Sequence, residues 1–127
     1  MCTVIERRRK ILCIDDDRET ASLICEELID RGFEVRAAFN GREGLGAILE
    51  DPPDLVLSDV MLPGRSGTDL IRHLRAYAGT QNLPVIAVTT LADEESETSL
   101  RSAGFTAIIP KPINPERFAT QVAGWLK

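Results

Sequence analysis

The sequence predicts an α/β domain built on a parallel sheet. Three observations support this class: five short apolar runs, a helical pattern after each run, and a length of 127 residues, which suits one domain. Strands that alternate with helices form βα units, and such units place helices on both faces of a parallel sheet. We therefore expect five strands and five helices in a doubly wound arrangement.

The elements follow one another in order along the chain. The first apolar run precedes a helical pattern whose apolar residues recur at i, i+3, i+4 and i+7, so this stripe is expected to face the core and Gly32 to end the helix. The stripe consists of Ala21, Ile24, Cys25 and Leu28. The expected strands are 11–14, 33–39, 55–57, 85–88 and 106–109, and the expected helices are 19–31, 42–50, 68–77, 94–103 and 116–126.

The apolar runs also predict the order of the strands. The first, third and fourth runs are apolar throughout, as strands buried on both faces should be. The second run begins by alternating apolar and charged residues, and the fifth is followed by Pro110, which cannot donate a hydrogen bond to a neighbouring strand. Both therefore suit the edges of the sheet. The order 2-1-3-4-5 satisfies these constraints and places its switch point between strands one and three.

Composition narrows the class of protein. Hydrophobic residues make up 43% of the chain, which is enough for an ordinary core, and the net charge of −5 disfavours binding to nucleic acid or to an anionic membrane surface. No apolar run approaches the roughly 18 residues of a membrane-spanning helix. Cys2, Cys13 and Cys25 match no zinc-binding spacing, so we interpret them as reduced thiols of a cytoplasmic protein. We expect a short basic lead-in over residues 1–9 and one domain over residues 10–127.

Polar residues stand where four of the expected strands end. The first strand runs into three consecutive aspartates at 15–17, and the third ends in Asp59. The fourth strand ends at Thr89, and Lys111 follows the fifth. Because the carboxyl ends of parallel strands meet at one edge of a sheet, we expect these side chains to converge.

The predicted switch point brings Asp15 and Asp16 beside Asp59. Three carboxylates at such short range repel one another and need positive charge nearby. We expect two sources of that charge: Mg²⁺, which prefers oxygen ligands, and the ammonium group of Lys111. A metal-bound carboxylate beside this lysine and the hydroxyl of Thr89 is equipped to attack phosphorus and to form an aspartyl phosphate.

The chain resembles the receiver domain of two-component response regulators. The resemblance covers residues 10 to about 126 and rests on four stretches in order: ILCIDDD, PDLVLSDVMLPGRSG, LPVIAVTT and PKP. The stretch DVMLPGRSG after an apolar strand is fairly specific, and the four together are highly specific. The resemblance implies a flavodoxin-like fold and a bacterial, cytoplasmic phosphoprotein of a phosphorelay, which acts as a signalling phosphoacceptor rather than as an enzyme.

The resemblance assigns roles around the metal site. Asp59 corresponds to the phosphoacceptor, Asp16 to the direct Mg²⁺ ligand, and Asp15 to an acid that usually acts through water. Met61 would offer its backbone carbonyl to the metal.

The resemblance also assigns the residues of a switch. Thr89 corresponds to the switch hydroxyl and Lys111 to the lysine that pairs with the phosphoryl group. The peptide bond between Lys111 and Pro112 corresponds to one that is cis in the family. The aromatic residue of the usual switch falls at Ile108, so only half of the threonine–aromatic pair is recognisable.

Two apolar residues flank the expected phosphoryl position. Met61 and Leu91 stand two residues after Asp59 and Thr89, respectively. Neither can orient an attacking water molecule, so we expect slow self-dephosphorylation.

Two other functions are compatible with parts of the sequence. Asp15 and Asp17 form a D-x-D motif after a strand, which resembles the haloacid-dehalogenase phosphatases, although Glu19 stands where that family usually has threonine or valine. The chain could also be a pseudo-receiver that keeps the fold as a docking scaffold without being phosphorylated. The intact set of strand-end residues disfavours this scaffold reading.

The resemblance implies protein partners on two sides of the reaction. The phosphoryl donor would be a histidine kinase or a phosphotransfer protein. A downstream protein would bind the face formed by the fourth helix, the fifth strand and the fifth helix. We expect no nucleic acid and no membrane to bind this chain, and we expect a monomer or a weak dimer.

Overall fold

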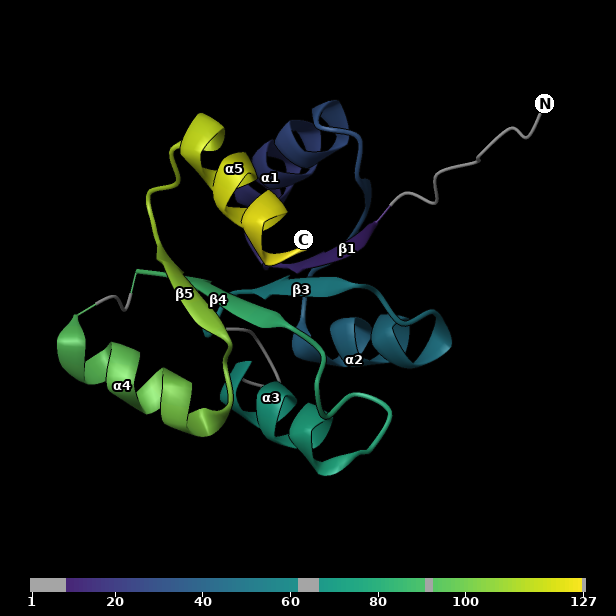
Figure 1. Ribbon diagram of the computed structural model, residues 1–127, viewed down its shortest axis with the longest axis vertical. Coiled ribbons are helices and arrows are strands. Elements are labelled where there is room, and N and C mark those ends of the chain that lie inside the picture. The colour runs from purple at the N-terminus through teal and green to yellow at the C-terminus, as the bar shows by residue number, and fades with distance from the viewer. Residues whose placement is uncertain (1–8, 62–66, 91–92, 127) are drawn as a thin grey trace.

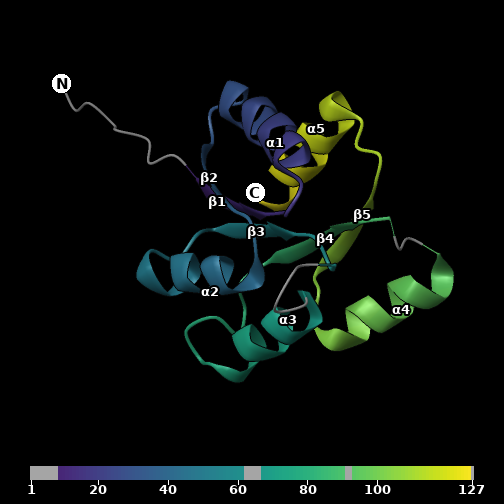
Figure 2. The same cartoon turned by 180° about the vertical axis from the view of Figure 1, so that it is seen from behind.

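The computed structural model describes residues 9–61, 67–90 and 93–126, which form a parallel sheet covered by helices on both faces (Figure 1, Figure 2). The elements alternate along the chain without exception, as the pattern of apolar runs predicts. They are β1 (Lys10–Ile14), α1 (Arg18–Asp30), β2 (Glu34–Ala38), α2 (Gly41–Glu50), β3 (Leu55–Ser58), α3 (Gly67–Ala76), β4 (Val85–Thr89), α4 (Glu94–Ala103), β5 (Ala107–Pro110) and α5 (Pro115–Trp125).

The strand order is β2-β1-β3-β4-β5, with every neighbouring pair parallel. This order confirms the doubly wound, flavodoxin-like prediction, with β2 and β5 at the edges. In the register between β1 and β3, Ile14 is opposite Ser58. The residues that follow these two, Asp15 and Asp59, therefore leave the sheet side by side at the switch point.

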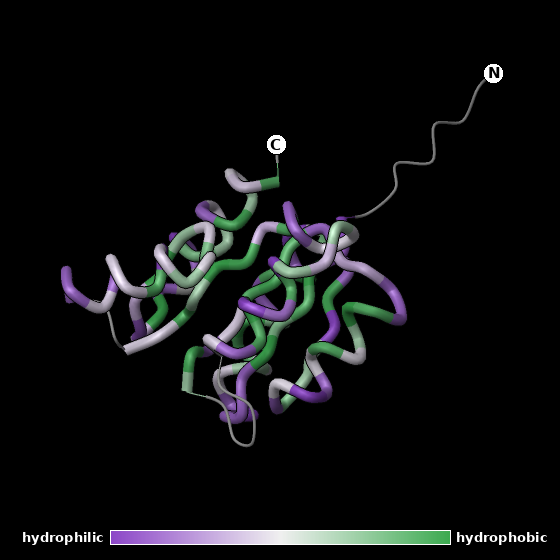
Figure 3. The backbone as a smooth tube through the Cα atoms, turned by 90° about the horizontal axis from the view of Figure 1, so that it is seen from below, coloured by the Kyte–Doolittle hydropathy of each residue, from purple (hydrophilic) through white to green (hydrophobic). Residues whose placement is uncertain are grey.

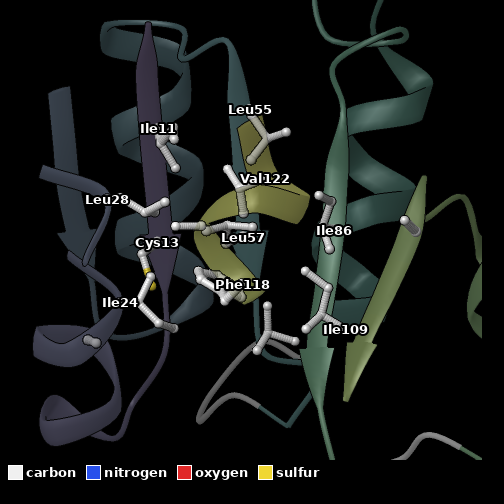
Figure 4. Packing of buried hydrophobic residues seen from close by; sticks show 14 residues of the cluster. Ile11, Cys13, Ile24, Leu28, Leu55, Leu57, Ile86, Ile109, Phe118 and Val122 are labelled. Carbon is white, nitrogen blue, oxygen red and sulfur yellow. The ribbon is translucent and has the colours of Figure 1, made fainter. Parts of the chain in front are cut away.

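Successive residues of each strand enter two separate cores. In β1, Ile11 and Cys13 face the layer of α1 and α5, whereas Leu12 and Ile14 face the layer of α2, α3 and α4. Figure 4 shows the first of these cores, where Phe118 and other side chains of α5 meet the strands. In Figure 3, green segments concentrate in the interior of the domain, and purple segments lie mostly at its periphery. Both faces of the central strands are thus buried in apolar cores, so polar functional groups can gather only at the strand ends.

The helix ends explain how α1 and α2 are positioned. Gly32 has a φ of 95° and follows α1, and Phe33 donates its backbone N–H to the carbonyl of Leu28, as in a Schellman motif. The predicted stop at Gly32 is therefore confirmed. In α2, a Cβ on Gly44 would lie 3.0 Å from Cγ1 of Ile14, so only glycine lets this helix lie so close to β1.

Of the predicted core stripe of α1, three residues are buried and Cys25 is half-buried at its margin. The expected lead-in falls almost entirely on residues 1–8, which lie outside the described residues, as do Cys2 and Leu91. None of the helices in the described part of the chain is long and apolar enough to cross a bilayer.

Candidate functional site

The site begins where β1 and β3 end. Asp15 donates its backbone N–H to the carbonyl of Ala38 at 3.1 Å, and Asp59 donates its N–H to the carbonyl of Ile14 at 2.9 Å. These bonds continue the sheet by one residue on each strand, so the backbone of both aspartates is fixed. Asp15 is buried, with 1% of its surface exposed, and Asp59 is half-buried. The two carboxylates are therefore held at the switch point that the sequence predicted.

Lys111 joins these two carboxylates. Its Nζ donates to Oδ2 of Asp15 at 2.8 Å and to Oδ2 of Asp59 at 3.0 Å, and only 17% of the lysine side chain is exposed. The backbone N–H of Lys111 donates to the carbonyl of Thr89 at 2.9 Å, and the bond from Lys111 to Pro112 is cis. The tip of β5 thus directs the ammonium group across the ends of β4 and β3.

Two opposing effects set the charge state of Lys111. Burial alone would lower the pKa of its ammonium group, but the hydrogen bonds and the charges of Asp15 and Asp59 outweigh burial and leave the pKa raised above its ordinary value. The lysine is therefore held in its charged form, and it neutralises part of the negative charge at the strand ends.

The three consecutive aspartates lie in three different environments. Asp15 is buried and accepts the backbone N–H of Asp17 at 3.0 Å, whereas Asp16 is exposed at the rim. Asp17 is the N-cap of α1, because it accepts the backbone N–H of Glu19 at 3.1 Å and the hydroxyl of Thr20 at 2.7 Å. The hydrogen bond from Thr20 is the main cause of a lowered pKa at Asp17. A helix cap thus accounts for one aspartate and leaves the other two for the site.

Asp15, Asp16 and Asp59 form a cluster that could hold a metal ion. Each offers a carboxylate oxygen, and these oxygens all lie within 4.8 Å of one another. When all are ionised, three carboxylates and the ammonium group of Lys111 carry a net charge of −2, which one divalent cation would balance. An all-oxygen donor set of this kind suits Mg²⁺. The residues present therefore fit the metal that the sequence predicts.

Met61 contacts the cluster through its backbone. Its N–H donates to Oδ1 of Asp59 at 3.2 Å, and its side chain is exposed. This bond fixes Oδ1 of Asp59, while Lys111 holds Oδ2. A role for the Met61 carbonyl as a metal ligand stays a prediction.

Thr89 is buried at the end of β4, with 1% of its surface exposed, beside the backbone of Lys111. Ile108, at the expected position of the switch aromatic, is opposite Ala87 in the register and is half-buried against the second core. Thr89 thus lies at the strand end beside Lys111, whereas the position expected for the switch aromatic holds a packed aliphatic side chain.

A partly apolar hollow adjoins the site. Its volume is about 390 Å³, and it lies beside Lys111 between α1 and the segment that follows β5. It is lined by Thr20, Leu23, Thr90, Lys111, Pro112 and Ile113. No sequence pattern predicts this hollow, because its apolar residues come from two segments that are distant in sequence, Leu23 in α1 and Pro112 and Ile113 after β5.

One polar centre away from the site was not predicted. Arg75, near the end of α3, donates to several backbone carbonyls at the opposite edge of the sheet. A signal for it exists in the sequence, since Arg75 stands four residues after Ile71 and so borders the apolar stripe of the helix.

Comparison with known proteins identifies the family. The sequence model of the response regulator receiver domain matches residues 11–123. The transcriptional regulatory protein CpxR of Klebsiella pneumoniae is 37% identical over 118 residues, which are 93% of this chain and 49% of CpxR. The sensor histidine kinase GacS of Pseudomonas protegens is 34% identical over 97% of this chain and 14% of GacS. The chain thus spans about half the length of CpxR and a smaller part of GacS.

Solved structures agree with the sequence match. The chemotaxis response regulator CheY4 of Vibrio cholerae has a TM-score of 0.90 and 28% identity, and the similarity covers 94% of this chain and all of CheY4. The strand order, the cluster of strand-end residues and these similarities all lead to one conclusion: the chain belongs to the receiver domain family of two-component response regulators.

Proposed function

We propose that this receiver domain is a binding module in the cytoplasm that is controlled by phosphorylation of Asp59. The donor is a phosphohistidine on a histidine kinase or on a phosphotransfer protein, and transfer requires Mg²⁺. The observation that carries the proposal is the bridge from Lys111 to both Asp15 and Asp59, with Asp16 within reach of the same metal position. Aspartates that only capped a helix or lay on the surface would need no such bridge to a lysine.

Several residues of the chain contribute to the transfer of the phosphoryl group. An oxygen of Asp59 attacks the phosphorus, a P–O bond forms, the P–N bond to the donor histidine breaks, and its electron pair returns to the imidazole nitrogen. The backbone N–H of Met61 orients one oxygen of Asp59. Lys111 lies beside the other oxygen, where its charge stabilises the transferring group. Mg²⁺, when bound by Asp15, Asp16 and Asp59, supplies charge stabilisation for the phosphoryl oxygens.

The change of state follows from contacts that differ before and after transfer. Lys111 is shared between two carboxylates before transfer, and a phosphoryl group on Asp59 offers it new oxygens. Thr89 is the last residue of the neighbouring strand β4, and its hydroxyl would donate to the same group. Such differential contacts are what a two-state switch requires. We propose that they alter the face of α4, β5 and α5, to which a downstream protein binds.

The hollow beside Lys111 supports a protein as the donor. A phosphohistidine must approach Asp59 closely, so its protein must cover the rim of the site. Leu23, which is 43% exposed, and Ile113 offer apolar contact at that rim.

The test is the intact mass of the protein after incubation with acetyl phosphate, with and without Mg²⁺. The wild type is expected to gain one phosphoryl group only with Mg²⁺, and Asp59→Asn should gain none while it keeps the fold. Asp51→Asn removes an acid from the opposite edge of the sheet and should be labelled like the wild type. A label that maps to Asp15 would support the phosphatase alternative instead. No label from acetyl phosphate or from a phosphorylated phosphotransfer domain would favour the docking scaffold.

A further inference from the structure

The segment that follows α4 is hydrogen-bonded to α3 through the side chain of Arg75. The guanidinium group of Arg75 reaches two loops, residues 80–83 and residues 104–106, and partial burial lowers its pKa. Its acceptors are the carbonyls of Gly104 at 3.0 Å, Thr80 at 3.2 Å, Gln81 at 3.1 Å and Leu83 at 2.7 Å, and Oγ1 of Thr106 at 3.4 Å. Within the described residues, no carboxylate is among these acceptors. The cation is thus solvated by backbone dipoles, which fixes the positions of all the segments that supply them.

The approach of Arg75 to the end of α4 depends on a glycine. Gly104 has a φ of 122°, and a Cβ at this position would lie 3.0 Å from Cγ of Arg75 and 3.3 Å from Cγ1 of Ile71. Phe105 then donates its N–H to the carbonyl of Leu100, and both side chains are buried in the second core. The last turn of α4 is therefore held by a half-buried cation, a tight backbone contact and two apolar anchors.

The N-terminal end of α4 has no comparable attachment. Asp93 accepts the backbone N–H of Ser96 at 2.8 Å, and the hydroxyl of Thr98 donates to the carbonyl of Glu94. Among the described residues, no hydrogen bond of residues 93–99 leads outside the helix and its N-cap. The only buried residue of α4 is Leu100, in the second half of the helix. In Figure 1 and Figure 2 the C-terminal end of α4 lies toward α3, and the N-terminal end points away from the other helices.

We propose that Arg75 is a positioning residue that anchors the C-terminal end of α4, so that the helix opens from its N-terminal end. In the unmodified protein, the anchor confines local opening to the first two turns. The second part of the proposal rests on the proposed function. Because α4 follows β4, which ends in Thr89, phosphorylation of Asp59 moves the N-terminal end of α4 and leaves its anchored C-terminal end in place. Arg75 therefore determines which half of α4 responds to phosphorylation.

Amide hydrogen exchange of the whole chain, followed by NMR, tests the anchor without any ligand. Relative to their intrinsic rates, amides of residues 97–99 should exchange at least about tenfold faster than those of 101–105. In Arg75→Met, exchange at 101–105 should accelerate about tenfold or more, because hydrogen bonds from a charged donor are lost. Amides of β1 and β3 report global unfolding. Equal rates along α4 in the wild type would overturn the proposal, as would an acceleration in Arg75→Met that is no larger at 101–105 than in β1 and β3.

Two further variants make this test specific. Arg72→Met removes the same charge from the exposed face of α3, where the side chain of Arg72 has no hydrogen bond to the described residues, and it should leave the exchange pattern of α4 unchanged. Arg75→Lys keeps the charge but cannot reach all five acceptors, so it should give a smaller acceleration at 101–105. It also takes the place of Arg75→Met if that variant does not fold.

Beryllofluoride with Mg²⁺, which imitates a phosphoryl group on a carboxylate, tests the second part. In the wild type, changes in chemical shift within α4 should be confined to residues 94–99, and in Arg75→Met they should spread to 101–105. Changes along all of α4 in the wild type would overturn this part while the proposed function stands. If the wild type responds to beryllofluoride no more than Asp59→Asn does, the proposed function fails, and the second part of the proposal fails with it. Hydrogen exchange in the unmodified protein still tests whether Arg75 anchors α4.

Discussion

At the scale of single residues, the site shows how neighbours in sequence acquire different chemistry from their surroundings. Asp15, Asp16 and Asp17 are identical side chains, yet one is buried against a lysine, one is exposed at the rim, and one caps a helix. The difference arises because the chain turns from β1 into α1 across these three residues. The three carboxylates therefore lie in different surroundings, and only Asp15 and Asp16 belong to the metal cluster.

The first prediction concerns Lys111 and alkaline pH in the absence of Mg²⁺. The folded-state pKa of Lys111 is raised above its ordinary value of about 10.5, so its stabilising effect is fully present below that value and is lost as pH rises through the raised one. Lys111→Met should therefore unfold at lower urea than the wild type at pH 8, and this gap should narrow above about pH 10.5. Lys10→Met, which breaks a more exposed ion pair at the opposite edge, should cost less at pH 8. A gap for Lys111→Met that stays constant to pH 12 would contradict the prediction.

The second prediction concerns the lifetime of the aspartyl phosphate. Met61 is apolar and exposed beside Asp59, and Leu91, outside the described residues, is apolar at the second expected position. A variant with Met61→Asn and Leu91→Gln should lose its phosphoryl group at least about tenfold faster, since a polar side chain can orient the attacking water. The decay of the phosphorylated mass over time measures this rate. Equal lifetimes for the variant and the wild type would show that the two apolar residues do not limit hydrolysis.

Residues at strand ends were predictable, whereas the hydrogen-bond acceptors of Arg75 were not. The rule that ligand sites lie at the carboxyl ends of parallel strands depends only on the order of elements, so it selected Asp59 and Lys111 from local patterns. The acceptors of Arg75 are backbone carbonyls, which every residue carries. Their convergence depends on the paths of two loops, and no local pattern records those paths.

At the scale of elements, the observed boundaries differ from the expected ones by at most one residue, and two of these shifts have a clear cause. The expected strand 85–88 extends to Thr89, because the carbonyl of Thr89 accepts the N–H of Lys111 from the neighbouring strand. The expected strand 33–39 shortens to Glu34–Ala38, because Phe33 completes the end of α1. Backbone hydrogen bonds set these limits, whereas hydropathy reports only on burial.

The third prediction concerns the packing of α2 on β1. Gly44→Ala would place a Cβ 3.0 Å from Cγ1 of Ile14, which is buried and flanked by other core residues. We expect a loss of about 1–3 kcal/mol in the free energy of unfolding, as is typical of overpacked cores. Gly46→Ala in the same helix has nothing within 4 Å and should instead stabilise by about 0.5–1 kcal/mol. Urea unfolding of both variants isolates the packing effect, and equal stabilities would refute it.

At the scale of the whole molecule, function and stability meet in one cluster of charges. The sheet forces three carboxylates together, and Lys111 compensates for only one of them. The fold therefore contains an electrostatic strain that the hydrophobic cores on both faces must outweigh. A divalent cation that binds the folded cluster, and not the unfolded chain, should relieve that strain and stabilise the entire domain.

The fourth prediction follows from this linkage. At a free Mg²⁺ concentration ten times its Kd, the free energy of unfolding should rise by about 1.4 kcal/mol, and removal of the metal with EDTA should reverse the gain. Asp16→Asn removes an exposed member of the cluster and should reduce the response, whereas Asp51→Asn should respond like the wild type. Samples matched in ionic strength with NaCl separate specific binding from screening. An equal gain in NaCl, or an undiminished gain in Asp16→Asn, would mean that the strain is relieved by general screening and that the cluster is not a metal site.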